Sequence, residues 1–150
     1  MKKKLAVLVM GLTLPLWGWL AQTFLSVFSF RIIHLLVFVA ACGIWGVLAF
    51  FAEDVLENTT QAVLLLNLPL WVILALFCVN VLAGPFLPEG FQNFLELCLL
   101  PVSFQHLNYY FLYVFTLPAP FAQILGAAFL FAASITGCKV RRDRWMGTGV

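Results

Sequence analysis

Two histidines, His34 and His106, are the side chains in this sequence best suited to hold a cofactor. Each lies near one end of a long apolar segment, so facing helices would bring both imidazoles to a similar depth, where they could ligate a haem iron or bind a quinone. No family motif surrounds either residue. The alternative role of each imidazole is a hydrogen bond at the edge of its segment. The sequence therefore predicts no bound cofactor and keeps this histidine pair as an alternative.

The sequence contains only weak indications of metal binding and of thiol chemistry. Glu89, Glu96 and His106 could together collect a divalent ion, but their spacing is not that of a zinc site or an EF-hand. The four cysteines, at positions 42, 78, 98 and 138, contain no C-x-x-C pair. We expect them to be small apolar side chains, with a Cys78–Cys98 disulfide as the alternative. No catalytic residue and no metal site are predicted, and enzymatic activity is not expected.

The composition places all of these residues in or beside a lipid bilayer. Of the 150 residues, 64% are hydrophobic and 9% are charged, whereas about 25% are charged in a soluble domain. The mean hydropathy is +1.07. These values exclude a water-soluble monomer and predict an integral membrane protein. They leave no room for a soluble catalytic domain, and we expect no nucleic-acid partner.

Four segments are long enough to cross the roughly 30 Å of bilayer hydrocarbon, which takes about 20 residues. The sequence thus predicts an all-α integral membrane fold, a four-helix transmembrane bundle formed as one domain. The helices are expected at about residues 5–29, 32–52, 62–84 and 110–138. The first follows three lysines, as a signal peptide would, but its apolar length favours a retained helix, with Pro15 as a kink.

Residues 86–106 are too polar and too rich in proline to span a bilayer. Apolar residues recur in this segment at a spacing of three to four, which predicts a short amphipathic helix lying in the membrane interface; they include Phe91, Phe94, Leu95 and Leu99. The following run, residues 107–138, has no charge and is longer than one crossing requires. We expect a bend in it at Pro118 and Pro120.

The basic residues predict the orientation of the bundle. Seven of the eight flank the first and the last helix: Lys2, Lys3, Lys4, Lys139, Arg141, Arg142 and Arg144. Because basic flanks stay in the cytoplasm, four spans with both termini cytoplasmic satisfy the positive-inside rule, and residues 139–150 form a basic tail. The interfacial segment then lies on the opposite side. The short loops and basic start favour a multi-pass protein of the bacterial cytoplasmic (inner) membrane.

The polar residues deep in the spans are neutral: Gln22, Asn67, Asn80 and Gln123. Intramembrane ionisable residues mark proton relays and ion pathways, and their lack here argues against a proton-coupled carrier. We expect the four amides to hold helices together, or alternatively to line a polar groove. Small residues on helix faces, such as Gly46 and Gly137, would allow close helix packing or the docking of a partner.

These features favour a small polytopic protein without catalytic machinery. The leading hypothesis is an accessory, assembly or immunity/exclusion-type protein that binds another membrane protein within the bilayer. The first alternative is a small oligomeric carrier or channel for a neutral or lipid-like substrate. The second is a redox subunit that binds haem or quinone through His34 and His106. The expected partners are the lipid bilayer and either another integral membrane protein or further copies of this chain.

Overall fold

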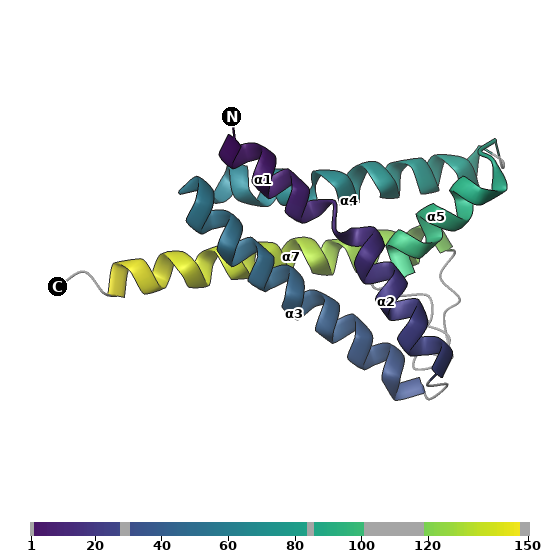
Figure 1. The fold of residues 1–150 in the computed structure, drawn as a ribbon, viewed down its shortest axis with the longest axis horizontal. Coiled ribbons are helices and arrows are strands. Elements are labelled where there is room, and N and C mark those ends of the chain that lie inside the picture. The colour runs from purple at the N-terminus through teal and green to yellow at the C-terminus, as the bar shows by residue number, and fades with distance from the viewer. Residues whose placement is uncertain (1, 28–30, 84–85, 101–118, 148–150) are drawn as a thin grey trace.

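The structure, a computed structural model, describes residues 2–27, 31–83, 86–100 and 119–147 (Figure 1). Every regular element in these ranges is a helix. The helices are α1 (Lys2–Gly11), α2 (Leu14–Val27), α3 (Arg31–Leu56), α4 (Thr59–Leu82), α5 (Glu89–Leu99) and α7 (Ala119–Gly147). Within the described residues, four stretches are long and apolar enough to cross a membrane: Lys2–Val27, Leu35–Leu56, Thr59–Leu82 and Pro120–Arg144. The all-helical fold and the four candidate spans of the sequence prediction are thereby confirmed.

The C-terminal helix α7 is the centre of the packing. It lies against α3 and α4, while α1 packs on α4 and α2 packs on α5 (Figure 1). Large buried side chains from several helices fill the space between them, among them Trp45, Leu66, Leu70 and Leu130. These buried faces are almost wholly apolar, and Glu53 is the one charged residue among the buried residues that the structure describes.

The first span is interrupted between α1 and α2, just before Pro15. Proline has no backbone N–H and cannot continue the helical hydrogen bonds of the preceding turn. The Thr13 hydroxyl donates to the Met10 carbonyl oxygen at 2.7 Å, and the Trp17 indole N–H donates to the Thr13 hydroxyl at 3.1 Å. This interruption lets α1 and α2 pack against different helices, with Gly11 of α1 in close contact with the Leu66 carbonyl of α4.

A two-residue connection reverses the chain between α3 and α4. Glu57 has a left-handed backbone, with φ of 54°, and its N–H donates to the Glu53 carbonyl at 2.7 Å. Asn58 then caps α4, its side chain accepting a hydrogen bond from the Gln61 N–H at 2.9 Å. This tight reversal holds the acidic residues at the C-terminal end of α3 beside the start of α4.

The helix of the last span extends beyond the sequence prediction at its C-terminal end. Helix α7 begins at Ala119, so Pro120 lies in its first turn, where a missing N–H costs no helical bond. Pro118 and the residues before it lie outside the described residues, so the expected bend at Pro118 and Pro120 stays a prediction. The helix also continues through residues 139–147, most of the expected basic tail, because Lys and Arg are good helix formers and favour a helix C-terminus.

The amphipathic helix expected within residues 86–106 is α5. It buries Leu95, Cys98 and Leu99 in the protein and exposes Phe91 and Phe94. The buried face packs against α2 and α4. Gly18 permits the closest approach, since a Cβ there would lie 2.0 Å from the Leu97 carbonyl oxygen. The apolar spacing of this segment thus serves protein packing as well as an exposed aromatic face.

Candidate functional site

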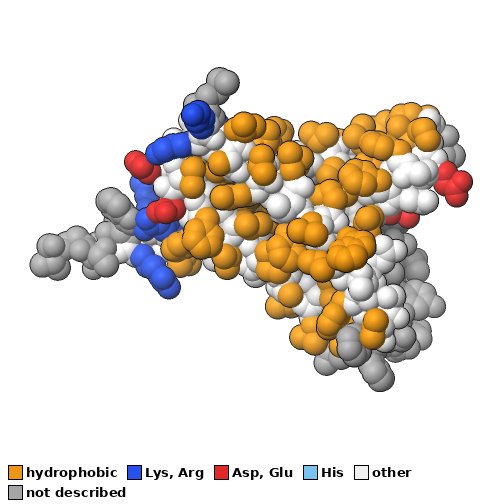
Figure 2. Space-filling view, in the orientation of Figure 1, with side chains coloured by type: hydrophobic (Ala, Val, Ile, Leu, Met, Phe, Trp, Pro, Cys, Tyr) orange, Lys and Arg blue, Asp and Glu red, His pale blue; other side chains and the backbone are white. Residues whose placement is uncertain are grey.

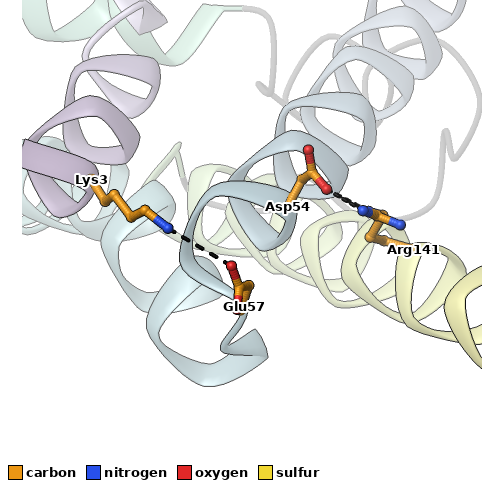
Figure 3. Close-up of polar contacts among 4 residues, drawn as sticks. All are labelled: Lys3, Asp54, Glu57 and Arg141. Atoms are coloured by element: carbon orange, nitrogen blue, oxygen red, sulfur yellow. Dashed lines mark hydrogen bonds and ion pairs between the residues drawn. The ribbon is translucent and has the colours of Figure 1, made fainter.

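The lysine and arginine side chains drawn in Figure 2 gather at one end of the bundle together with some of the acidic ones, while other acidic side chains lie at the opposite end. Lys3 Nζ lies 3.8 Å from Glu57 Oε1, and the Arg141 guanidinium pairs with Asp54, its Nε 3.0 Å from Oδ1 (Figure 3). The first pair joins the start of α1 to the α3–α4 connection, and the second joins the last turns of α7 to the C-terminal end of α3. The basic residues near the two termini therefore lie at the same end of the molecule.

This end contains a cavity of about 550 Å³, which we call the charged pocket. Its lining is Glu53, Asp54, Glu57, Asn58, Thr59, Thr60, Arg141 and Arg142. Carboxylates at the C-terminal end of α3 oppose the helix dipole, and cationic partners offset that repulsion. The pocket thus presents carboxylates, hydroxyls and guanidinium groups within one small volume.

Glu53 is the most buried of these carboxylates, with 9% of its surface exposed. The Thr59 hydroxyl donates to Oε1 at 2.8 Å. Oε2 is buried and receives no hydrogen bond from the described residues. Glu53 was not singled out from the sequence as a site residue, although its spacing of four from buried Ala49 places both on one face of α3.

A second polar cluster joins α3, α4 and α7 in the centre of the bundle. The Trp45 indole N–H donates to Asn67 Oδ1 at 2.9 Å. Asn67 Nδ2 donates to the Ser134 hydroxyl at 2.9 Å and to the Val63 carbonyl at 2.8 Å, and Ser134 donates to the Leu130 carbonyl at 2.9 Å. Every side-chain donor of this cluster makes a hydrogen bond. Asn67 thus connects α4 to α3 and α7, which is the helix-joining role, one of the two expected for it.

The other predicted amides have different surroundings. Asn80 Oδ1 accepts hydrogen bonds from the backbone N–H groups of Phe86 and Leu87, each at 3.1 Å, and so holds the connection from α4 to α5. Gln123 is buried, and its Oε1 has no donor among the described residues. The side chain of Gln22 is exposed on α2, and its expected role stays a prediction. The face of α2 that is buried carries Leu14, Gly18 and Ala21 instead.

The structure gives no position for the histidine pair. The side chain of His34 and all of His106 lie outside the described residues. Among the residues that are described, no group of three or more His, Cys, Asp or Glu side chains is placed to hold a metal ion. The haem or quinone alternative therefore stays a hypothesis.

An apolar groove of about 430 Å³ separates α2 from the first half of α3. Only apolar side chains line it. They include Ala21 and Phe24 from α2, Ala40 and Ala41 from α3, and Leu130 from α7. Between Leu14 and Phe24 the α2 side of the groove is about 15 Å long, at a rise of about 1.5 Å per residue. We call this feature the apolar groove.

All four cysteines are free thiols in the structure, which gives no support to the Cys78–Cys98 disulfide alternative. Cys98 lies on α5, outside the four spans, and is fully buried. Burial raises the pKa of its thiol to about 11. Since the thiolate is the form that reacts, Cys98 is protected both by its pKa and by its position.

We expect Cys98 to react slowly with a membrane-impermeant maleimide in detergent at pH 7. Only about one thiol in ten thousand is ionised at pH 7, four pH units below a pKa of about 11, so the rate should rise about tenfold per unit between pH 7 and 9. Peptide mass spectrometry would measure labelling at each cysteine, with an Asn93→Cys variant as the exposed control on the same helix. Equal rates for positions 93 and 98 at pH 7 would contradict the burial of Cys98.

The two candidate sites lie in different parts of the bundle. The charged pocket is built from the ends of α3, α4 and α7, whereas the apolar groove lies along α2 and the first half of α3. Comparisons with protein-family models, with curated proteins and with solved structures found no match to this chain.

Proposed function

We propose that this protein binds another integral membrane protein within the bilayer, as an accessory, assembly or immunity/exclusion-type protein. The observation that carries the proposal is the apolar groove between α2 and α3. Its lining includes small residues from both sides: Ala21, Ala40 and Ala41. In lipid, helices associate where small side chains let their backbones approach closely. We infer that the groove receives a transmembrane helix of the partner.

The length of the groove supports this occupant. About 15 Å corresponds to roughly three helical turns, or half of the ~30 Å hydrocarbon core. A partner helix would therefore contact α2 and α3 through one half of its span. The exposed Phe24 and Leu36 at the groove would add apolar contact area to that interface.

The central polar cluster supports binding rather than transport of a polar substrate. Asn67 donates to Ser134 and to the Val63 carbonyl and accepts from Trp45, so these side chains already satisfy one another. A polar cargo that crossed the bundle here would have to break these bonds, which costs free energy in a buried site.

We further propose the setting of this function. Ion pairs join the basic ends of α1 and α7 to the α3–α4 connection and to the C-terminal end of α3, which supports an arrangement with both ends in one compartment. The positive-inside rule assigns that compartment to the cytoplasm. A multi-pass protein of the bacterial inner membrane fits this arrangement.

The test fills the groove without changing the rest of the surface. Ala40→Phe adds bulk in the groove, and Ala132→Phe adds the same bulk at an exposed position of α7. Both variants and the wild type are purified in nanodiscs from the native host and weighed by native mass spectrometry. We expect a stoichiometric foreign membrane protein with the wild type and with Ala132→Phe, and its loss with Ala40→Phe. Equal retention by both variants, or no foreign subunit with the wild type, would refute the proposal.

A small oligomeric carrier for a neutral or lipid-like substrate is the second candidate. The same groove favours it, because a wholly apolar channel beside α2 could take an acyl chain. Four helices enclose little space, so a carrier of this size would assemble from several copies. In the same measurement a homo-oligomer that retains lipid, with no foreign subunit, would select the carrier.

A further inference from the structure

We propose that the charged pocket binds a ligand in which a primary ammonium group is joined to a phosphate, as in the headgroup of phosphatidylethanolamine. This inference goes beyond the proposed function, because the pocket and the apolar groove share no residue. It starts from an unused acceptor: Glu53 is nine-tenths buried and lines the pocket, and its Oε2 receives no hydrogen bond from the described residues.

The neighbours of Glu53 leave that oxygen without a donor. Thr59 donates to the other carboxylate oxygen, and Arg141 donates to Asp54. The Cys138 thiol is in weak hydrogen-bonding contact with the carboxylate, but its single proton is directed to the Ala49 carbonyl oxygen at 3.4 Å. A buried carboxylate oxygen without a donor is costly, and an ammonium group would supply a charge-assisted hydrogen bond.

A second lining residue of the pocket, Arg142, offers a cation for the phosphate. Arg142 lines the pocket, is exposed, and forms no ion pair with the described residues. A guanidinium group binds phosphate oxygens through two parallel N–H donors. Glu53 and Arg142 thus carry opposite charges, and neither belongs to an ion pair among the described residues. A zwitterionic ligand could pair its ammonium group with Glu53 and its phosphate with Arg142.

The size and depth of the pocket favour a lipid headgroup over a free compound. A volume of about 550 Å³ is within the range of small-ligand sites, about 300–1,000 Å³. The pocket lies where the candidate spans end, at Leu56, Thr59 and Arg144. Headgroups occupy the layer just outside the hydrocarbon core, which is the same depth.

The experiment compares two lipids that differ only at the amine. Delipidated protein in detergent is titrated with phosphatidylethanolamine or phosphatidylcholine of identical acyl chains, and bound lipid is counted by native mass spectrometry. The choline ammonium has no N–H, so it cannot donate to Glu53 Oε2. We expect wild-type protein to bind phosphatidylethanolamine about tenfold more tightly, as one charge-assisted hydrogen bond allows. Equal affinity for the two lipids would overturn the proposal.

Two variants separate the roles of the pocket residues. Glu53→Gln keeps the side-chain shape and should abolish the preference for phosphatidylethanolamine, while Arg142→Gln should weaken the binding of both lipids. Lys139→Gln removes an exposed charge of α7 outside the pocket and should change neither. If Glu53→Gln fails to fold, exposed Arg142 still tests the site. Equal effects of the Lys139 and Arg142 variants would reveal unspecific attraction and refute a defined site.

A soluble competitor distinguishes a lipid headgroup from a free compound as the source of the ammonium and phosphate groups. Excess O-phosphoethanolamine should displace the lipid only weakly if the bilayer supplies the ligand. Displacement at concentrations below that of the lipid would overturn the lipid assignment in favour of a free zwitterion. The groove variant Ala40→Phe should retain the lipid preference, so failure of this proposal and failure of partner binding are measured separately.

Discussion

Gly137→Ala is expected to destabilise the bundle by about 3 kcal/mol, near the upper end for overpacking a core. A Cβ at Gly137 would lie 2.0 Å from the Gly46 carbonyl oxygen, so the backbones of α3 and α7 would have to separate. These are backbone atoms, and no side-chain rotation can relieve the contact. Separation of the two helices would also weaken the hydrogen bond from Cys138 to the Ala49 carbonyl.

Gly43→Ala is the matched control for this change. Gly43 also lies inside a candidate span, but a Cβ there meets nothing within 4 Å. Alanine favours a helix over glycine by about 1 kcal/mol, so this variant should be as stable as the wild type or slightly more stable. Unfolding in mixed detergent, followed by tryptophan fluorescence, would give both values. Similar midpoints for the two variants would contradict the close α3–α7 crossing.

Asn67→Leu should lower the free energy of unfolding by about 2 kcal/mol. Hydrogen bonds between transmembrane helices average only about 0.6 kcal/mol, but this change also leaves the Trp45 indole N–H buried without an acceptor. An unsatisfied buried donor costs about 1–3 kcal/mol. The bond that would be lost joins α3 to α4 at 2.9 Å, and a second joins α4 to α7 at the same distance.

A double-mutant cycle tests whether the loss comes from this pair. Trp45→Phe removes the indole donor, and the combination with Asn67→Leu should cost less than the sum of the single changes. Asn93→Leu makes the same replacement at an exposed position of α5 and should leave stability nearly unchanged. Additive effects of the Trp45 and Asn67 changes would show that their hydrogen bond contributes no stability.

Much of the fold could be predicted because it depends on properties of single segments. Hydropathy and length located the four candidate spans, since crossing hydrocarbon requires about 20 apolar residues whatever their neighbours. The break before Pro15 follows from a missing N–H, and the apolar spacing of α5 follows from helical periodicity. The extra helical turns at residues 139–147 were missed because basic composition was interpreted as a tail.

The candidate sites depend on which helix faces meet, and a single sequence carries little information about that. Glu53, Asp54 and Glu57 look equivalent as an acidic group, yet only Glu53 turns inward with Ala49 and Ala52. The periodicity of α3 contained a signal for this, but only a packed neighbour makes one face the inner one. The hydrogen bond from Trp45 to Asn67 was missed for the same reason, because Trp45 is 22 residues away and on another helix.

Taken alone, the sequence determined a helical fold with four segments long and apolar enough to span a membrane and with basic residues near both ends, because hydropathy, length and charge act locally. Tertiary structure decided that Gly137 meets Gly46, that Asn67 joins three helices, and that α2 leaves an apolar groove beside α3. It also left Glu53 with an unused oxygen in the charged pocket. The physical reason is that these features require atoms from separate helices to lie within a few ångströms, and in lipid the choice among apolar faces is made by shape and by hydrogen bonds rather than by hydrophobicity.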